Sequence, residues 1–160
     1  MESLRVLREL IARLPERLLS MPAEKVGHKP APNTWSGKEE LGHLLDSAVN
    51  NHQRIVRTQL EEKPVMPGYD ADAWVELHRY QQREWATLVN LWAALNQQVL
   101  VAAEAVPAAA WSRTCTIADS APLTLQFVFD DYVLRHMVHH LQHIGVDVED
   151  LVRIKAATHH

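Results

Sequence analysis

Residues 124–144, TLQFVFDDYVLRHMVHHLQHI, are the stretch of this sequence that decides its fold, and Gly145 follows them directly. Hydrophobic side chains recur in the stretch at steps of three and four residues. This is the period of an α-helix that packs one face against a core. Glycine readily takes the left-handed backbone conformation that ends many helices. We therefore predict one long helix from about Thr124 to Ile144, with Gly145 as its C-terminal cap.

Three other stretches have the same helical period. Residues 2–20 place leucines and an isoleucine on one stripe, with Pro15 expected to bend or interrupt the helix. A second helix is expected from Ser36 to about residue 62, because Ser36 and Glu39 match a capping box. A third is expected to start near Asp70 and to end before Pro107. Its periodic residues are Trp74, Leu77, Trp85, Leu88, Leu91, Trp92, Leu95 and Val99.

These helices predict an all-α protein in one domain, residues 1–160, most simply a four-helix bundle. The segments expected to connect the helices are rich in proline, and residues 107–122 form a long connection of the kind that is often functional. Residues 146–155 are expected to add a short fifth helix.

Composition excludes several classes of function. The chain has 160 residues, 47 % of them hydrophobic, and a formal net charge of −4, which gives no reason to expect binding to nucleic acid or to an anionic membrane. Cys115 is the single cysteine, so no disulfide forms within the chain and a cytoplasmic location is expected. Charged residues interrupt the N-terminal stretch, which argues against a signal peptide. His159 and His160 are either native or the remainder of a purification tag.

Four of the ten histidines lie in residues 136–143 as two pairs spaced by four residues, His136 with His140 and His139 with His143. This spacing places both members of a pair on one helix face, where two imidazoles can reach one divalent ion. On a helical wheel His136 and His140 border the hydrophobic face, whereas the other pair points towards solvent. The alternative to a metal site is a polar flank that is rich in histidine.

A third ligand is needed, and His43 is the best candidate. It lies opposite the hydrophobic arc of its predicted helix, so it fits either a polar cleft wall or, more simply, a solvated face. Asp46 follows one turn later and could orient a ligating imidazole, or could be a surface residue. Glu40 and His43 form one Glu-x-x-His motif, but no second one is present, so a two-iron carboxylate site is not expected.

Several segments, in this order, resemble the DinB superfamily and within it the YfiT-like group of proposed metal-dependent hydrolases and thiol S-transferases. They are Pro32-Asn33-Thr34-Trp35-Ser36, His43-Leu44-Leu45-Asp46-Ser47 with Asn50 and Asn51, Tyr69-Asp70 with Trp74, and Tyr132 leading into His136-x-x-x-His140 and Gln142-His143-Ile144. The resemblance implies an up-down-down-up four-helix bundle, commonly a homodimer. It also implies a metal site formed by His43, His136 and His140.

By this resemblance the chain is expected to be an enzyme that acts on a small molecule, as a hydrolase or as an S-transferase that uses a low-molecular-weight thiol. The cofactor is a divalent metal ion, with zinc or nickel preferred and iron or manganese as alternatives. A non-catalytic helical-bundle binding protein, with a structural metal or none, is the competing interpretation. Neither nucleic acid nor a membrane is expected as a partner.

Overall fold

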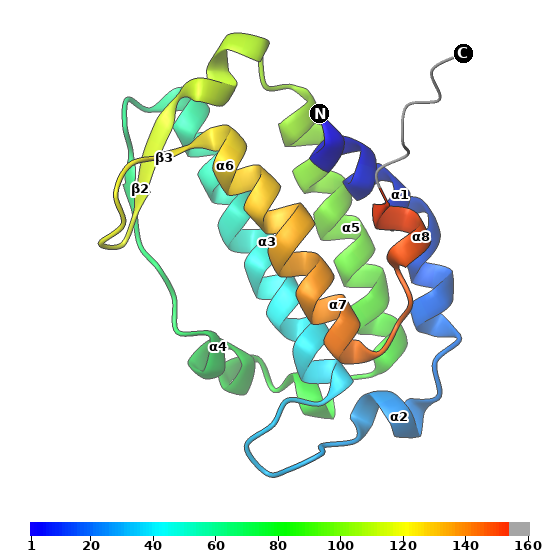
Figure 1. Cartoon of the computed structure of the whole chain (residues 1–160). Coiled ribbons are helices and arrows are strands. Elements are labelled where there is room, and N and C mark those ends of the chain that lie inside the picture. The colour runs from blue at the N-terminus through cyan, green and yellow to red at the C-terminus, as the bar shows by residue number, and fades with distance from the viewer. Residues whose placement is uncertain (154–160) are drawn as a thin grey trace, which may run out of the picture.

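The computed structural model describes residues 1–153, so His159 and His160 lie outside the described residues. Its main body is a four-helix bundle, in which the fourth helix has three consecutive parts. The helices are α1 (Glu2–Leu19), α3 (Gly37–Leu60), α5 (Trp85–Glu104), and α6 (Leu125–Asp130), η3 (Asp131–Met137) and α7 (Val138–Ile144). Figure 1 shows α1 and the fourth helix running in one direction and α3 and α5 in the other. The predicted up-down-down-up bundle is confirmed.

The two predicted helix caps are present, whereas the predicted interruption at Pro15 is not. Ser36 Oγ accepts a hydrogen bond from the Glu39 backbone N–H at 3.2 Å, and the Glu39 carboxylate accepts one from the Ser36 N–H, also at 3.2 Å. Gly145 ends α7 in the left-handed conformation, with φ of 91°. The helix α1 continues through Pro15, which removes only one backbone donor from an otherwise complete helix.

The third predicted helix is wrong as a single element, because the chain breaks at Arg79. This residue has a left-handed φ of 51° and separates α4 (Ala71–His78) from the short helix η1 (Tyr80–Gln82), after which α5 begins. The break carries the buried ring of Tyr80 against α3 at Gly42. A Cβ atom at Gly42 would lie 2.1 Å from that ring, so only glycine allows this approach.

A small sheet that was not predicted lies beside the start of the fourth helix (Figure 1). Its strands are β1 (Val65–Met66), β2 (Thr114–Ile117) and β3 (Leu123–Thr124), with β1 parallel and β3 antiparallel to β2. The remaining short helices are α2 (Ala23–Gly27), η2 (Ala108–Ser112) and α8 (Glu149–Val152). The last of these lies within the predicted fifth helix. The sheet joins the two long connections of the bundle to each other.

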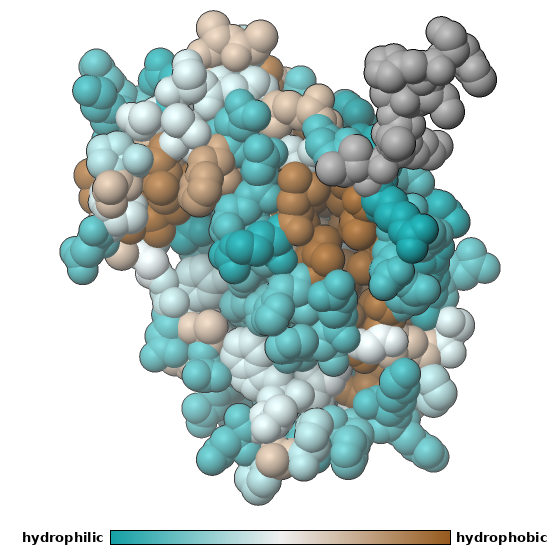
Figure 2. Space-filling view, in the orientation of Figure 1, coloured by the Kyte–Doolittle hydropathy of each residue, from teal (hydrophilic) through white to brown (hydrophobic). Residues whose placement is uncertain are grey.

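The core is built from hydrophobic side chains of α1, α3, α5 and the fourth helix, among which leucine is the commonest. Within it Tyr132 donates a hydrogen bond to Asn96, so the polar atoms of this buried pair are matched. Figure 2 shows a mostly hydrophilic face with a hydrophobic strip between the fourth helix and α1. Among the described residues, none of the helices has the length and hydrophobicity needed to cross a bilayer.

Candidate metal centre

Three histidines from two helices meet on the inner side of the bundle. His43 extends from α3, His136 from η3 and His140 from α7. Their ring centroids form an almost equilateral triangle, with sides of 4.8, 4.5 and 4.6 Å. The Nε2 atoms of His43 and His136 are 2.9 Å apart. One ring nitrogen from each histidine lies within 4.8 Å of the others, so all three face a common point.

His43 is only 5 % exposed, and the interpretation of its helix face as solvated is wrong. Two aromatic rings cover this polar side of α3. Trp35 lies 4.9 Å from the His43 ring and Tyr69 lies 6.3 Å from it, both between ring centroids. The helical period of the sequence correctly placed His43 on the side of its helix that faces away from the hydrophobic arc. It could not show that residues before α3 and after β1 enclose the opposite face as well.

Glu40 supports the centre and was not assigned a role from the sequence. Its Oε2 atom lies 2.6 Å from Nδ1 of His140, and its Oε1 atom lies 3.3 Å from Nδ1 of His143. The carboxylate is buried, at 7 % exposure. Because it occupies the Nδ1 side of His140, it leaves Nε2 of that ring facing the centre. The signal available in the sequence was the position of Glu40 one helical turn before His43.

The other two histidines differ in what contacts their Nδ1 atoms. Ser47 Oγ lies 3.4 Å from Nδ1 of His136, and the same hydroxyl accepts a hydrogen bond from Asn51. Nδ1 of His43 is buried and has no hydrogen-bond partner in the described part of the chain. His136 is thus oriented by a hydroxyl, whereas His43 is held by the packing of its ring.

Asp46 is buried near the centre, but its carboxylate contacts a different set of residues. Oδ1 accepts a hydrogen bond from the Tyr80 hydroxyl at 2.6 Å and lies 3.1 Å from Nδ1 of His78. Within residues 1–153, no hydrogen bond joins Asp46 to any of the three central histidines. The carboxylate that directly orients one of them is Glu40, whereas Asp46 fixes Tyr80 against α3.

The protonation of the centre suits a metal ion. Burial, followed by the like charge of the neighbouring histidines, lowers the pKa of His43 to about 3 and that of His136 to about 4. Both rings are therefore neutral at pH 7, and neutral imidazole is the form that binds metal. Three facing imidazole nitrogens without a carboxylate among them form a donor set that fits zinc, nickel or iron.

Residues 136–143 also contain a second, more exposed group of histidines. His139 and His143 have ring centroids 4.2 Å apart. Together with His140 they also place one ring nitrogen each within 4.8 Å of the others, as the inner group of His43, His136 and His140 does. The side chain of His143 is 52 % exposed. The prediction that this pair faces solvent is confirmed, and His140 is the one residue that belongs to both groups.

A four-helix bundle that gathers three histidines at an internal polar site defines a class of proteins with a candidate metal centre. The family model described as the DinB superfamily matches residues 7–144. The chain therefore belongs to the DinB superfamily, as the motifs around its histidines had indicated.

Relatives within this superfamily carry names that refer to metal. A protein of Halalkalibacterium halodurans named "Putative metal-dependent hydrolase" is 25 % identical over 149 residues, which cover 91 % of this chain and 84 % of that protein. Bacillus subtilis YfiT, with the same designation, is 30 % identical over 74 residues, which cover 46 % of this chain and 42 % of YfiT. These names suggest that a divalent metal belongs to the group.

The fold itself matches a solved structure. The structure of Bacillus subtilis YfiT, described as "a probable metal-dependent hydrolase with an unusual four-helix bundle topology", aligns with a TM-score of 0.73 at 21 % identity. The alignment covers 91 % of this chain and 87 % of YfiT. At this identity the match establishes the shared fold.

Proposed function

We propose that this protein is a metal-dependent enzyme that holds a divalent ion at His43, His136 and His140 and acts on a small molecule. The observation that carries the proposal is the convergence of three imidazoles from two helices on one point, one of them buried and two partly buried. Zinc and nickel are the preferred ions, with iron and manganese as alternatives. Three protein ligands leave room for water or substrate, which is the arrangement of catalytic rather than structural zinc sites.

When bound, such an ion supplies a Lewis acid that lowers the pKa of a coordinated water or thiol and so provides a nucleophile near neutral pH. The chain's own groups support this chemistry. The Glu40 carboxylate accepts a hydrogen bond from Nδ1–H of His140 and thereby makes its Nε2 atom a stronger electron-pair donor to a metal. Burial raises the pKa of Tyr69, so this phenol stays protonated and can donate a hydrogen bond to a substrate oxygen.

Hydrolysis is the first activity that we propose, since the relatives are named for it. Transfer to a low-molecular-weight thiol is the second, because the positive charge of an ion at this centre favours a thiolate over a thiol. The two are distinguished with protein reconstituted with zinc or nickel. Ester and amide hydrolysis is measured without thiol, and conjugation of an electrophile is measured with a low-molecular-weight thiol. Absence of both activities in fully metallated protein would favour the non-catalytic binding protein.

Metal content tests the site independently of activity. We expect about one divalent ion per chain by elemental analysis, strongly reduced in the His136→Ala variant and retained in His139→Ala. These two positions are three residues apart on the same helix, but only His136 belongs to the inner group. His140→Ala is expected to lose the ion too, although it cannot separate the two groups because it belongs to both. Full metal content in His136→Ala would refute the assignment.

A variant of His159 and His160, each changed to alanine, provides the background for all of these measurements. It removes two terminal histidines that could bind metal on their own. The expected loss of metal in His136→Ala should be the same in this background.

A further inference from the structure

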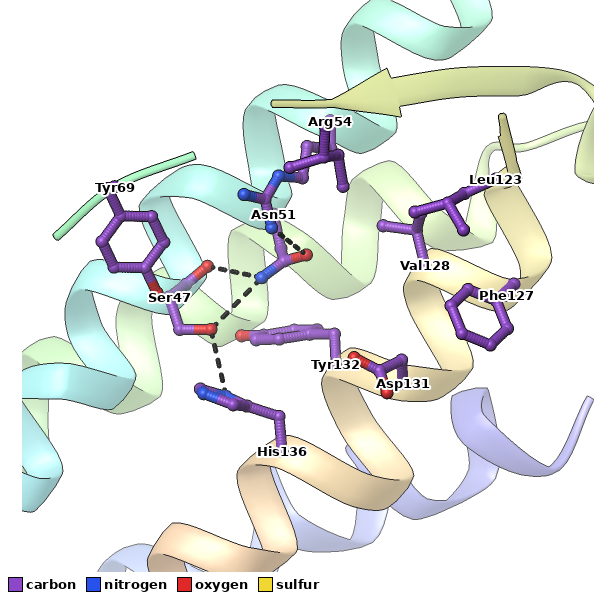
Figure 3. A pocket seen from close by; sticks show the side chains of 11 residues that line it. Ser47, Asn51, Arg54, Tyr69, Leu123, Phe127, Val128, Asp131, Tyr132 and His136 are labelled. Atoms are coloured by element: carbon purple, nitrogen blue, oxygen red, sulfur yellow. Dashed lines mark hydrogen bonds between the residues drawn. The ribbon is translucent and has the colours of Figure 1, made fainter. Parts of the chain in front are cut away.

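One cationic side chain, that of Arg54, lies in a cavity next to the histidine centre and has no acidic partner within residues 1–153. The cavity has a volume of about 110 Å³ and is lined by Arg54, Ser47, Tyr69 and His136, among others. Figure 3 shows Arg54 at one end of this space and His136 at the other, with Ser47 and Asn51 between them. Arg54 follows His43 by eleven residues, which is close to three turns, so both extend from the same face of α3.

The guanidinium of Arg54 is half-buried and its charge is not compensated. In the described part of the chain, no carboxylate lies within 4.0 Å of it, and its one side-chain hydrogen bond is a long contact of 3.4 Å from Nη1 to Asn51 Oδ1. Asp131 also lines the cavity, but its carboxylate is paired with Arg135. Burial lowers the pKa of Arg54, in agreement with a cation that is held away from water.

Such an arrangement is unfavourable unless something else pairs with the cation. A partly desolvated charge without a partner costs free energy, and proteins usually pair it or expose it. Nothing in the local fold requires arginine here, because Asn51 already bonds to Ser47 and to its own helix. The unpaired guanidinium is therefore available to an anionic group that enters the cavity.

We propose that Arg54 binds the carboxylate of a small-molecule substrate, whose reacting end then lies at His136 and the histidine centre. This inference rests on the proposed function for the reacting end, but the carboxylate site stands on Arg54 itself. The planar fork of arginine matches a carboxylate in a bidentate manner. A single guanidinium with amide and hydroxyl neighbours matches one carboxylate group, whose two oxygens it can bind side by side. The substrate class is thus small carboxylic acids with a reactive group several bonds from the carboxylate.

The test uses succinate as the probe and its neutral analogue succinamide as the matched ligand. Binding to the full-length protein is followed by NMR titration, both after removal of metal with a chelator and after reloading with zinc. We expect wild type to bind succinate and to discriminate against succinamide in both states, because the carboxylate site does not need the ion. Arg54→Met should weaken succinate binding about tenfold or more, as expected for loss of a charged hydrogen bond.

Arg57→Gln is the control, since Arg57 lies one turn further along α3 and pairs on the surface with Glu61. It should bind succinate as wild type does. Arg54→Lys should give intermediate binding, because it keeps the charge and loses the fork. In addition, Arg54→Met should melt at the same temperature as wild type or higher, since it removes an unpaired cation. A lower melting temperature would indicate a structural role for Arg54 and would overturn the proposal.

Equal binding of succinate by wild type and Arg54→Met, or no binding to either, would also overturn it. Tighter binding of inorganic phosphate than of succinate would overturn the assignment to a carboxylate. Loss of metal from the histidine centre affects only the reloaded samples. Failure of the proposed metal site therefore leaves the metal-free titration of Arg54 interpretable.

Discussion

Replacing Glu40 by glutamine should weaken metal binding without removing any proposed ligand. The 2.6 Å contact from Oε2 to Nδ1 of His140 is a partly buried, charge-assisted hydrogen bond. Such a bond contributes about 1.5–3 kcal/mol, whereas the neutral amide of glutamine retains about 0.5–1.5 kcal/mol. The difference of about 1.4 kcal/mol corresponds to a tenfold change in dissociation constant. Loss of an outer carboxylate commonly costs 10–100-fold, so about tenfold is the lower bound that we expect.

The assay is a competition titration of metal-free protein with zinc against a chelating dye. Glu39→Gln is the matched control, because it makes the same chemical change one residue earlier and glutamine still completes the capping box. This control should bind zinc as wild type does. If Glu40→Gln binds zinc as tightly as wild type and the control, then the carboxylate does not orient His140 and the reasoning from this contact fails.

Two further predictions concern stability. Gly42→Ala should destabilise the protein by about 2 kcal/mol in urea unfolding, because the new methyl group collides with the Tyr80 ring and this cost exceeds the gain in helix propensity. Gly27→Ala, which meets no atom within 4 Å, should be neutral; equal effects of both would contradict the argument. In metal-free protein, stability should fall as the pH drops below about 6.5, by up to about 1.4 kcal/mol per pH unit for each of the two histidines. The sign follows because His43 and His136 have lowered pKa values when folded, so the unfolded chain binds more protons there. His43→Gln should flatten this dependence in melting scans, and an unchanged slope would count against it.

Much of the fold could be predicted because local signals and tertiary packing agree along most of the chain. The capping box at Ser36, the glycine after α7 and the hydrophobic period of each long helix all act through neighbouring residues. The break at Arg79 could not be predicted in this way. No proline or glycine lies at the break, and the hydrophobic period of the sequence continues across it. The break accompanies a contact between Tyr80 and Gly42, which are far apart in the sequence.

The site was predictable in part for a related reason. The spacing of His136 and His140 follows from helix geometry alone, so their common face could be read from the sequence. The burial of His43 depends on Trp35 and Tyr69, which approach from other segments, and only the family resemblance indicated it. The strands of the small sheet are two to four residues long, too short to produce a recognisable alternating pattern.

The middle part of the fourth helix, η3, has a consequence for how this protein can vary. Residues 131–137 are π-helical, a form that accommodates one additional residue compared with a regular α-helical turn. The π-helical turn takes up this residue locally, so the helix beyond it keeps its direction and face. A single deletion in this turn, before His136, would therefore restore an ordinary helical turn and still leave His136 and His140 four residues apart on the face that meets His43. The triangle thus tolerates a change of length before His136, but not between its own two histidines.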